Sequence, residues 1–234
     1  MDLTNSLEDV IRCRIYNRLP VSWLFKQGIK QIYVAGNCLN RESPHDIDLF
    51  PVVSCDFAPI KEFDVPGLLV RTKNADTFLT NDGVKVQFCW YEHPTLEDLV
   101  QSFDFAHVQI GAMVKIESEY SSVVHKIYYS DDWLKAHAME STRYVHSAYP
   151  LSSLMRLIKY AERDCFSGRA YIPSIINILI DIIQRGFTNY EDFKDQLDAV
   201  DLGLVDEDLK ECNLMKLFDL LKKSDKGVFD ADKW

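Results

Sequence analysis

Residues 33–50 read YVAGNCLNRESPHDIDLF, and this stretch decides the fold that the sequence predicts. The segment 31–34 is typical of a strand, and it ends at Gly36, where the backbone can turn tightly. A loop follows, and residues 46–53 are typical of a second strand. The stretch therefore predicts two strands that are joined through a glycine turn.

Two aspartates, Asp46 and Asp48, lie two positions apart in the second of these strands. Because side chains i and i+2 of a strand point to the same face, the carboxylates stand side by side, and Ile47 and Leu49 face the core. Carboxylates this close repel each other unless a cation lies between them. Magnesium prefers oxygen ligands and takes one or two carboxylates together with substrate phosphates. The pair predicts a site for Mg²⁺ or Mn²⁺; the alternative is two surface aspartates that begin a strand.

The glycine turn favours the metal site over that alternative. Gly36 and Asn37 follow the first strand and precede the aspartates, so the backbone turns beside the carboxylates. Amides exposed in such a turn bind phosphate, and a glycine lets the phosphate approach the backbone closely. A phosphate cradle that faces metal ligands is what phosphoryl or nucleotidyl transfer requires.

This order of parts resembles the polymerase-beta-like nucleotidyltransferase superfamily. The superfamily pattern is a strand, a Gly-Gly or Gly-Ser turn, a spacer, and then Asp-x-Asp or Asp-x-Glu. Here the pattern is Gly36-Asn37, eight further residues, and Asp46-Ile47-Asp48. The segments SFDFAHVQ (102–109) and YPLSSLMRLIKYAERD (149–164) are similar to a phage and bacterial branch of nucleotidyltransferase-like proteins.

The remaining sequence predicts two domains. Within the first 115 residues, the segments typical of strands are 31–34, 46–53, 68–71, 84–91 and 103–114. From about Trp133 the pattern is helical, and Thr188 and Glu191 have the spacing of a helix capping box. We expect an α+β fold: a nucleotidyltransferase-like domain with a mixed sheet and flanking helices in residues 1–130, and a helical domain in residues 131–234.

Two positions depart from the superfamily pattern. Asn37 replaces the usual second Gly or Ser of the turn, and its side chain can still donate to a phosphate. The superfamily normally has a third carboxylate on a later strand, but the strand 84–90 carries Gln87 at the expected place. Asp104, between two phenylalanines, is the alternative third acid, with its carboxylate pointing outward. Asp104 is equally consistent with a residue that caps a turn.

Further candidates lie on the helix expected from Leu151 to Asp164. One face of this helix carries basic and aromatic residues at helical spacing, namely Arg156, Lys159, Tyr160 and Arg163. The face is either an ordinary solvated surface or a surface that meets a triphosphate or an RNA backbone. The resemblance implies a basic residue of the helical domain on the triphosphate, so we select Arg156 and Lys159. Ser153, in the first helical turn, is a further phosphate ligand.

Composition limits the classes of function. The chain has 234 residues, is 47% apolar and carries a net charge of −10, which argues against non-specific coating of nucleic acid. The six cysteines have no metal-type spacing, and the N-terminus lacks the order of a signal peptide. The most apolar run, 172–183, is too short to span a bilayer and is expected to be core. We therefore expect a soluble, cytoplasmic protein without a membrane partner.

These features predict a magnesium-dependent nucleotidyltransferase. Asp46 and Asp48 would hold the metal, Gly36 and Asn37 would bind the phosphates of a nucleoside triphosphate such as ATP, and Asp104 would supply the third acid. The nucleotide would pass to an acceptor hydroxyl, and pyrophosphate would leave. The resemblance implies an RNA 3′ end, especially that of tRNA, as the acceptor; a protein hydroxyl or a small molecule is the rival. The alternatives are a module of the same fold that binds nucleotide or a protein partner without turnover, and a structural interaction protein.

Overall fold

A computed structural model describes residues 3–40, 46–52, 67–72, 74–162, 171–198 and 214–221. These residues belong to two compact units, Met1–Met139 and Glu140–Trp234, and the strands that the structure describes lie in the first unit.

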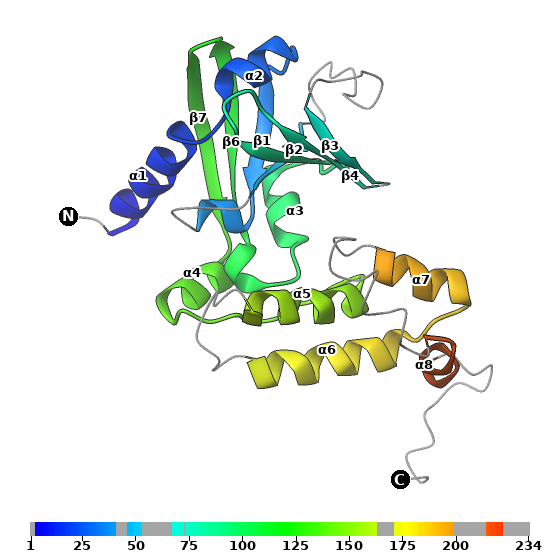
Figure 1. Cartoon of the computed structure of the whole chain (residues 1–234). Coiled ribbons are helices and arrows are strands. Elements are labelled where there is room, and N and C mark those ends of the chain that lie inside the picture. Colours follow the sequence, from blue (N-terminus) through cyan, green and yellow to red (C-terminus); the bar gives the residue numbers. More distant parts are fainter. Residues whose placement is uncertain are drawn as a thin grey trace. The chain divides into compact units, whose positions relative to one another are not determined.

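The first unit alternates short helices with strands (Figure 1). In chain order its elements are α1 (Leu3–Tyr16), α2 (Val21–Lys26), β1 (Gln31–Ala35), the 3₁₀ helix η1 (Asn37–Leu39), β2 (Ile47–Pro51), β3 (Leu68–Arg71), β4 (Ala75–Leu79), β5 (Lys85–Cys89), α3 (Leu96–Gln101), η3 (Ala106–Val108), β6 (Ile110–Ser118), β7 (Ser121–Tyr129) and α4 (Asp131–Ala138). The described helices of the second unit are α5 (Pro150–Glu162), α6 (Tyr171–Arg185), α7 (Tyr190–Asp198) and α8 (Leu214–Leu221). The arrangement confirms the predicted α+β fold class.

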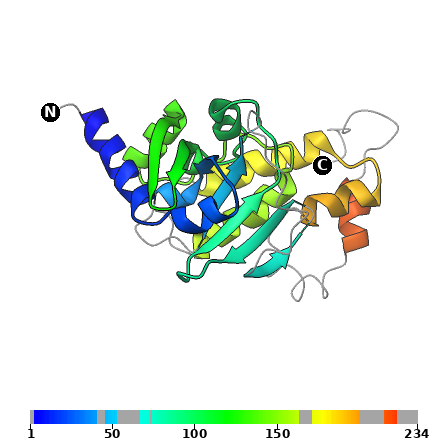
Figure 2. The same ribbon diagram turned by 90° about the horizontal axis from the view of Figure 1, so that it is seen from above.

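The strands form one seven-stranded mixed sheet in the order β3-β4-β5-β2-β1-β6-β7. Only β2 and β5 pair in parallel; the other neighbours are antiparallel. Seen from above in Figure 2, β6 and β7 lie at one end of the sheet, and β3 and β4 lie at the other. The two strands of the opening stretch, β1 and β2, are therefore central neighbours, and the register Val34↔Leu49 brings the end of β1 beside the start of β2.

Two hydrophobic cores cover the two faces of the sheet. One core contains Ile47 and Leu49 of β2 together with α1 and α2 residues such as Leu24. Their burial confirms that Ile47 and Leu49 face the core. The opposite core joins residues such as Phe50 to α3. Since side chains alternate along a strand, Asp48 shares the α3 face of the sheet with Phe50.

Helix α3 is fixed against the sheet by its cap and by a glycine. Thr95 Oγ1 accepts a hydrogen bond from the amide of Asp98 at 3.1 Å, as an N-cap residue does. A Cβ atom at Gly111 of β6 would lie 2.9 Å from side-chain atoms of both Leu96 and Val100. The absence of a side chain at Gly111 thus allows α3 to pack closely on β6.

Some expectations for the first unit were wrong. The strand expected at 103–114 begins only at Ile110, because Ala106–Val108 form η3. The edge strand β7 follows β6 directly and was not predicted. Buried and exposed residues do not alternate regularly along β7, because Val124 is the one residue of this strand that is buried.

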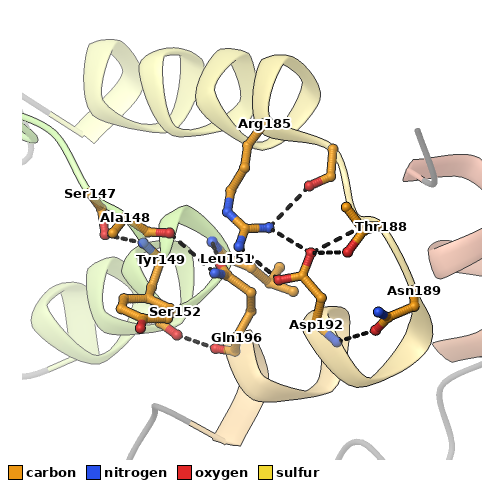
Figure 3. Close-up of polar contacts among 11 residues, drawn as sticks. Ser147, Ala148, Tyr149, Leu151, Ser152, Arg185, Thr188, Asn189, Asp192 and Gln196 are labelled. Atoms are coloured by element: carbon orange, nitrogen blue, oxygen red, sulfur yellow. Dashed lines mark hydrogen bonds and ion pairs between the residues drawn. The ribbon is translucent and has the colours of Figure 1, made fainter. Parts of the chain in front are cut away.

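Polar contacts join the helices of the second unit, as Figure 3 shows. Arg185, at the end of α6, forms an ion pair with Asp192 of α7 at 2.8 Å. Gln196 of α7 accepts from the amide of Leu151 at 3.4 Å and donates to the carbonyl of Ala148 at 3.2 Å. These contacts tie α7 to the start of α5 and to the end of α6.

Two expectations for the second unit also need correction. Helix α7 begins after Asn189, whose Oδ1 accepts from the Asp192 amide at 2.8 Å, so the cap is one residue beyond the predicted Thr188. The run 172–183 is core only in part: Ser174, Ile178 and Ile182 are buried, whereas its other apolar residues are exposed, namely Ile172, Ile175, Ile176, Leu179, Ile180 and Ile183. No helix within the described ranges is both long and apolar enough to cross a membrane.

Candidate functional site

The glycine turn at the end of β1 lies against the carboxylate of Asp48. Gly36 has a φ of 90° and a ψ of −155°, a backbone conformation that is essentially restricted to glycine. A Cβ atom at Gly36 would lie 3.5 Å from Asp48 Oδ2. The turn and the acid, which are twelve positions apart in the sequence, are therefore neighbours in the fold.

Asp46 immediately precedes β2 and Asp48 is its second residue, and both are half-buried. Two cysteine thiols lie close enough to the aspartates for the carboxylate charges to change the pKa values of the thiols. Burial raises the pKa of both Cys38, in η1, and Cys89, in β5, and the negative charges of Asp48 and Asp46 raise these pKa values further. The turn, the start of β2 and the end of β5 thus converge on one acidic place. The sequence pattern did not indicate the proximity of Cys89 to the aspartates, because it arises from the pairing of β2 with β5.

Gln87 lies directly beside Asp48 on the neighbouring strand. The parallel register of β2 and β5 pairs Asp48 with Gln87, and the antiparallel register of β4 and β5 pairs Gln87 with Thr77. Gln87 Nε2 donates to Thr77 Oγ1 at 3.5 Å. A neutral amide therefore stands next to the acid pair on the same face of the sheet.

The donor atoms at this place fit a hard divalent cation. The carboxylates of Asp46 and Asp48 are two such donors. Asn37 follows Gly36 in the turn, and its Oδ1 atom is buried and has no hydrogen-bond partner among the described residues. Leaving a buried acceptor unsatisfied costs about 1–3 kcal/mol, so a ligand or ion that contacts it is favoured. Oxygen donors of this kind suit Mg²⁺ or Mn²⁺.

Within the described ranges, no group of three or more His, Cys, Asp or Glu side chains could hold a metal ion. Magnesium commonly takes one or two protein carboxylates and completes its shell with water and substrate phosphates. The metal site at Asp46 and Asp48 stays a prediction.

Asp104 lies in the bend between α3 and η3, and it is only 6% exposed. The expectation that its carboxylate points outward is therefore wrong. Phe105, beside it, is fully buried, and Phe103 packs against Phe50 with ring centroids 5.9 Å apart. The role of Asp104 as a third acid stays a prediction.

The predicted phosphate ligands of the helical domain lie on α5. Ser153 is fully buried, and its Oγ donates to the carbonyl of Tyr149 at 3.3 Å, one turn back in the chain. Arg156 is half-buried. The side chain of Lys159 and the whole of Arg163 lie outside the described part of the chain. Their contact with a triphosphate or an RNA backbone stays a prediction.

Comparison with known proteins gives similarity to solved structures only. No protein-family model matches the chain, and no curated protein matches it. The Thermotoga maritima CCA-adding enzyme complexed with tRNA is 14% identical with a TM-score of 0.48, over 92% of this chain and 54% of that chain. A CCA-adding enzyme in complex with ATP is 16% identical with a TM-score of 0.47, over 94% of this chain and 55% of that chain. A CCA-adding enzyme with CTP is 15% identical with a TM-score of 0.47, over 87% of this chain and 49% of that chain.

The chain thus spans about half the length of these structures. A likeness of this size concerns the fold, and a fold does not determine an activity. The residues of the site have to carry any functional conclusion.

Proposed function

We propose that the protein is a nucleotidyltransferase, which transfers a nucleoside monophosphate from a nucleoside triphosphate to an acceptor hydroxyl. The observation that carries this proposal is the contact between the Gly36 turn and Asp48, since a Cβ atom at Gly36 would lie 3.5 Å from the carboxylate. A phosphate bound at this turn would lie next to two carboxylates, which is the arrangement that nucleotidyl transfer uses.

The roles of the residues follow from their chemistry. The turn at Gly36 and Asn37 would bind the β- and γ-phosphates, and Asp46 and Asp48 would hold Mg²⁺. A bound metal ion supplies positive charge to the phosphoryl oxygens and aligns the reacting groups. The acceptor hydroxyl loses its proton to solvent water and its oxygen forms a bond to the α-phosphorus. The bond from that phosphorus to the bridging oxygen breaks, and pyrophosphate leaves with the electron pair. Asp104 remains the candidate for a third acid.

We propose that the acceptor is the 3′ end of an RNA, as the resemblance to the superfamily implies. The first candidate is the 3′ end of tRNA. The net charge of −10 is compatible with contact at one end of an RNA, because a long footprint on the backbone needs many basic contacts. Arg156 and Lys159 are the basic residues that we propose for the triphosphate or the RNA backbone. A protein hydroxyl is the rival acceptor.

A second function is favoured by Gln87. A neutral amide beside Asp48 is a weaker metal ligand than a carboxylate, so the site would bind Mg²⁺ and nucleotide without efficient turnover. In this case the protein is a nucleotide-binding module rather than an enzyme.

Pyrophosphate release distinguishes the two functions. The full chain is incubated with Mg²⁺, each nucleoside triphosphate and a pool of short RNAs or tRNA, and both pyrophosphate and RNA length are measured. The enzyme releases pyrophosphate and extends the RNA, and Asp46→Asn and Asp48→Asn each abolish the reaction. Asp82→Asn, an exposed aspartate in the turn between β4 and β5, is the matched control and keeps the activity. Nucleotide binding without pyrophosphate release would support the binding module.

A further inference from the structure

Two arginines near the C-terminal end of α1 bind the carbonyl groups of the glycine turn. Arg14 Nη1 donates to the carbonyl of Leu39 at 2.7 Å, and Arg18 Nη1 donates to the carbonyl of Cys38 at 3.4 Å. Both side chains are half-buried, and they lie four positions apart. Cys38 and Leu39 are the last two residues of η1, where helix carbonyls have no partner within the helix. The two guanidinium groups therefore supply the donors that the end of η1 lacks.

The arginines approach the turn from the side opposite to the acids. They line a small pocket together with Val34, Cys38, Leu39, Ile47 and the α1-side residues Ile15 and Leu19. Val34 and Ile47 belong to the core under α1, whereas Asp48 lies on the other face of the sheet. Arg14 and Arg18 thus stand behind the turn, and an effect on the phosphate site would act through the turn.

Hydrogen bonds to other segments hold the two ends of the turn. The amide of Gly36 donates to the carbonyl of Ile110 at 2.9 Å, and Asn40 accepts from Trp133 Nε1 at 3.0 Å and donates to the carbonyl of His107. Between these ends, the single 3₁₀ turn is closed by Leu39 N to Gly36 O at 3.2 Å and by Asn40 N to Asn37 O at 3.1 Å. Short 3₁₀ turns have poorer hydrogen-bond geometry than α-helices. The arginines therefore add charge-assisted donors to the part of the turn that its own hydrogen bonds hold least firmly.

We propose that Arg14 and Arg18 are positioning residues, which hold the Gly36–Leu39 turn in the shape that binds the triphosphate. This inference rests on the proposed function. Their positive charges behind the turn also favour an anionic substrate in a chain whose net charge is −10. In the sequence, the two arginines show only as basic residues four positions apart, which does not indicate what the side chains contact.

The test compares turn stability and nucleotide affinity in the double variant Arg14→Met/Arg18→Met. Hydrogen exchange of the Leu39 and Asn40 amides, which close the turn, should become about tenfold faster, as expected when a charge-assisted hydrogen bond is lost. The dissociation constants of Mg²⁺-ATP and Mg²⁺-CTP should each rise about tenfold. The Arg14→Lys/Arg18→Lys variant retains the positive charges without the guanidinium geometry. Its affinity for the nucleotides should lie between those of the wild type and the double methionine variant.

Arg12→Met is the matched control. Arg12 lies on the same helix and donates to the carbonyl of Val124 in β7 at 2.8 Å, so it anchors α1 without contacting the turn. Its loss should lower the melting temperature and leave both turn exchange and nucleotide affinity unchanged.

Three outcomes separate the possibilities. If the wild type binds nucleotide and the double methionine variant binds it equally well, the positioning role is refuted and the proposed function stands. An equal loss of affinity in Arg12→Met would show a general effect of destabilising α1 and would also refute that role. If the wild type binds neither nucleotide with Mg²⁺, the proposed function fails, and the positioning role fails with it.

Discussion

Replacement of Gly36 by alanine perturbs both the backbone of the turn and the space beside Asp48. The φ of 90° and ψ of −155° lie in a region that alanine avoids, and holding a non-glycine residue there costs about 1–3 kcal/mol. The added Cβ would lie 3.5 Å from Asp48 Oδ2, which is ordinary contact. Backbone strain, rather than overlap, therefore determines the loss of stability.

The expected loss can be converted to a melting temperature. For a chain of 234 residues, each kcal/mol lowers the melting temperature by about 2–4 °C, so Gly36→Ala should lower it by about 2–12 °C. Because the new methyl group stands where a phosphate would approach, the dissociation constant of Mg²⁺-ATP should rise by at least about tenfold, or about 1.4 kcal/mol. Thermal unfolding and isothermal titration calorimetry measure the two effects.

Gly83→Ala is the control for backbone strain alone. Gly83 has a φ of 77°, and a Cβ atom there would meet nothing within 4 Å. This variant should lose about 1–2 kcal/mol of stability and keep its nucleotide affinity. If Gly36→Ala has the stability and affinity of the wild type, the link between this turn and phosphate binding is refuted.

Three further predictions concern packing, acid stability and thiol reactivity. Ile178→Ala should cost about 2–5 kcal/mol in urea unfolding because Ile178 is 0% exposed, whereas Ile176→Ala, at a site 52% exposed, should cost less than about 1 kcal/mol. The hydrogen bond from Arg185 lowers the pKa of the Asp192 carboxyl in the folded state. Ionised Asp192 therefore stabilises the fold above the pKa of about 3.9 that it has in the unfolded chain, and this stabilisation is lost as the pH falls through the lowered folded pKa. Asp192→Asn should thus be destabilised relative to wild type at pH 7, and the difference should shrink as the pH falls below about 3.9. Iodoacetamide at pH 8 should modify exposed Cys13 more than about tenfold faster than buried Cys38. Burial raises the pKa of the Cys38 thiol, and the thiolate is the reactive form. Peptide mapping measures the two rates, and equal rates would contradict this prediction.

Local features of the sequence predicted the centre of the fold and the closeness of the Gly36 turn to Asp48. The two apolar segments around Gly36 became β1 and β2, and the alternation in Asp46–Leu49 placed Ile47 and Leu49 in the core. A glycine between a strand and an acidic pair predicts a turn beside the acids, and the close contact of Gly36 with Asp48 agrees with it. These features depend on residues close in sequence and on simple strand geometry.

Contacts that arise from pairing of distant segments were beyond the sequence patterns. The register that pairs Gln87 with Asp48 agrees with the place that the resemblance to the superfamily implied for Gln87. The place of Cys89 near the same acids was not predicted, because it depends on the order of strands in the sheet. Strand β7 was missed because an edge strand with one buried residue lacks a clear period-two pattern. The apolar run of α6 was assigned to the core because hydrophobicity alone does not indicate which face of a helix is covered.

The most direct test of a metal-dependent nucleotide site is a crystal structure of the full chain soaked with Mn²⁺ and a non-hydrolysable ATP analogue. Anomalous scattering of Mn²⁺ locates the ion independently of activity. We predict a Mn²⁺ peak bound by the carboxylates of Asp46 and Asp48, with the phosphates of the analogue against the Gly36–Asn37 turn. A nucleotide bound elsewhere, or no Mn²⁺ at these two aspartates at saturating concentration, would contradict the proposed site.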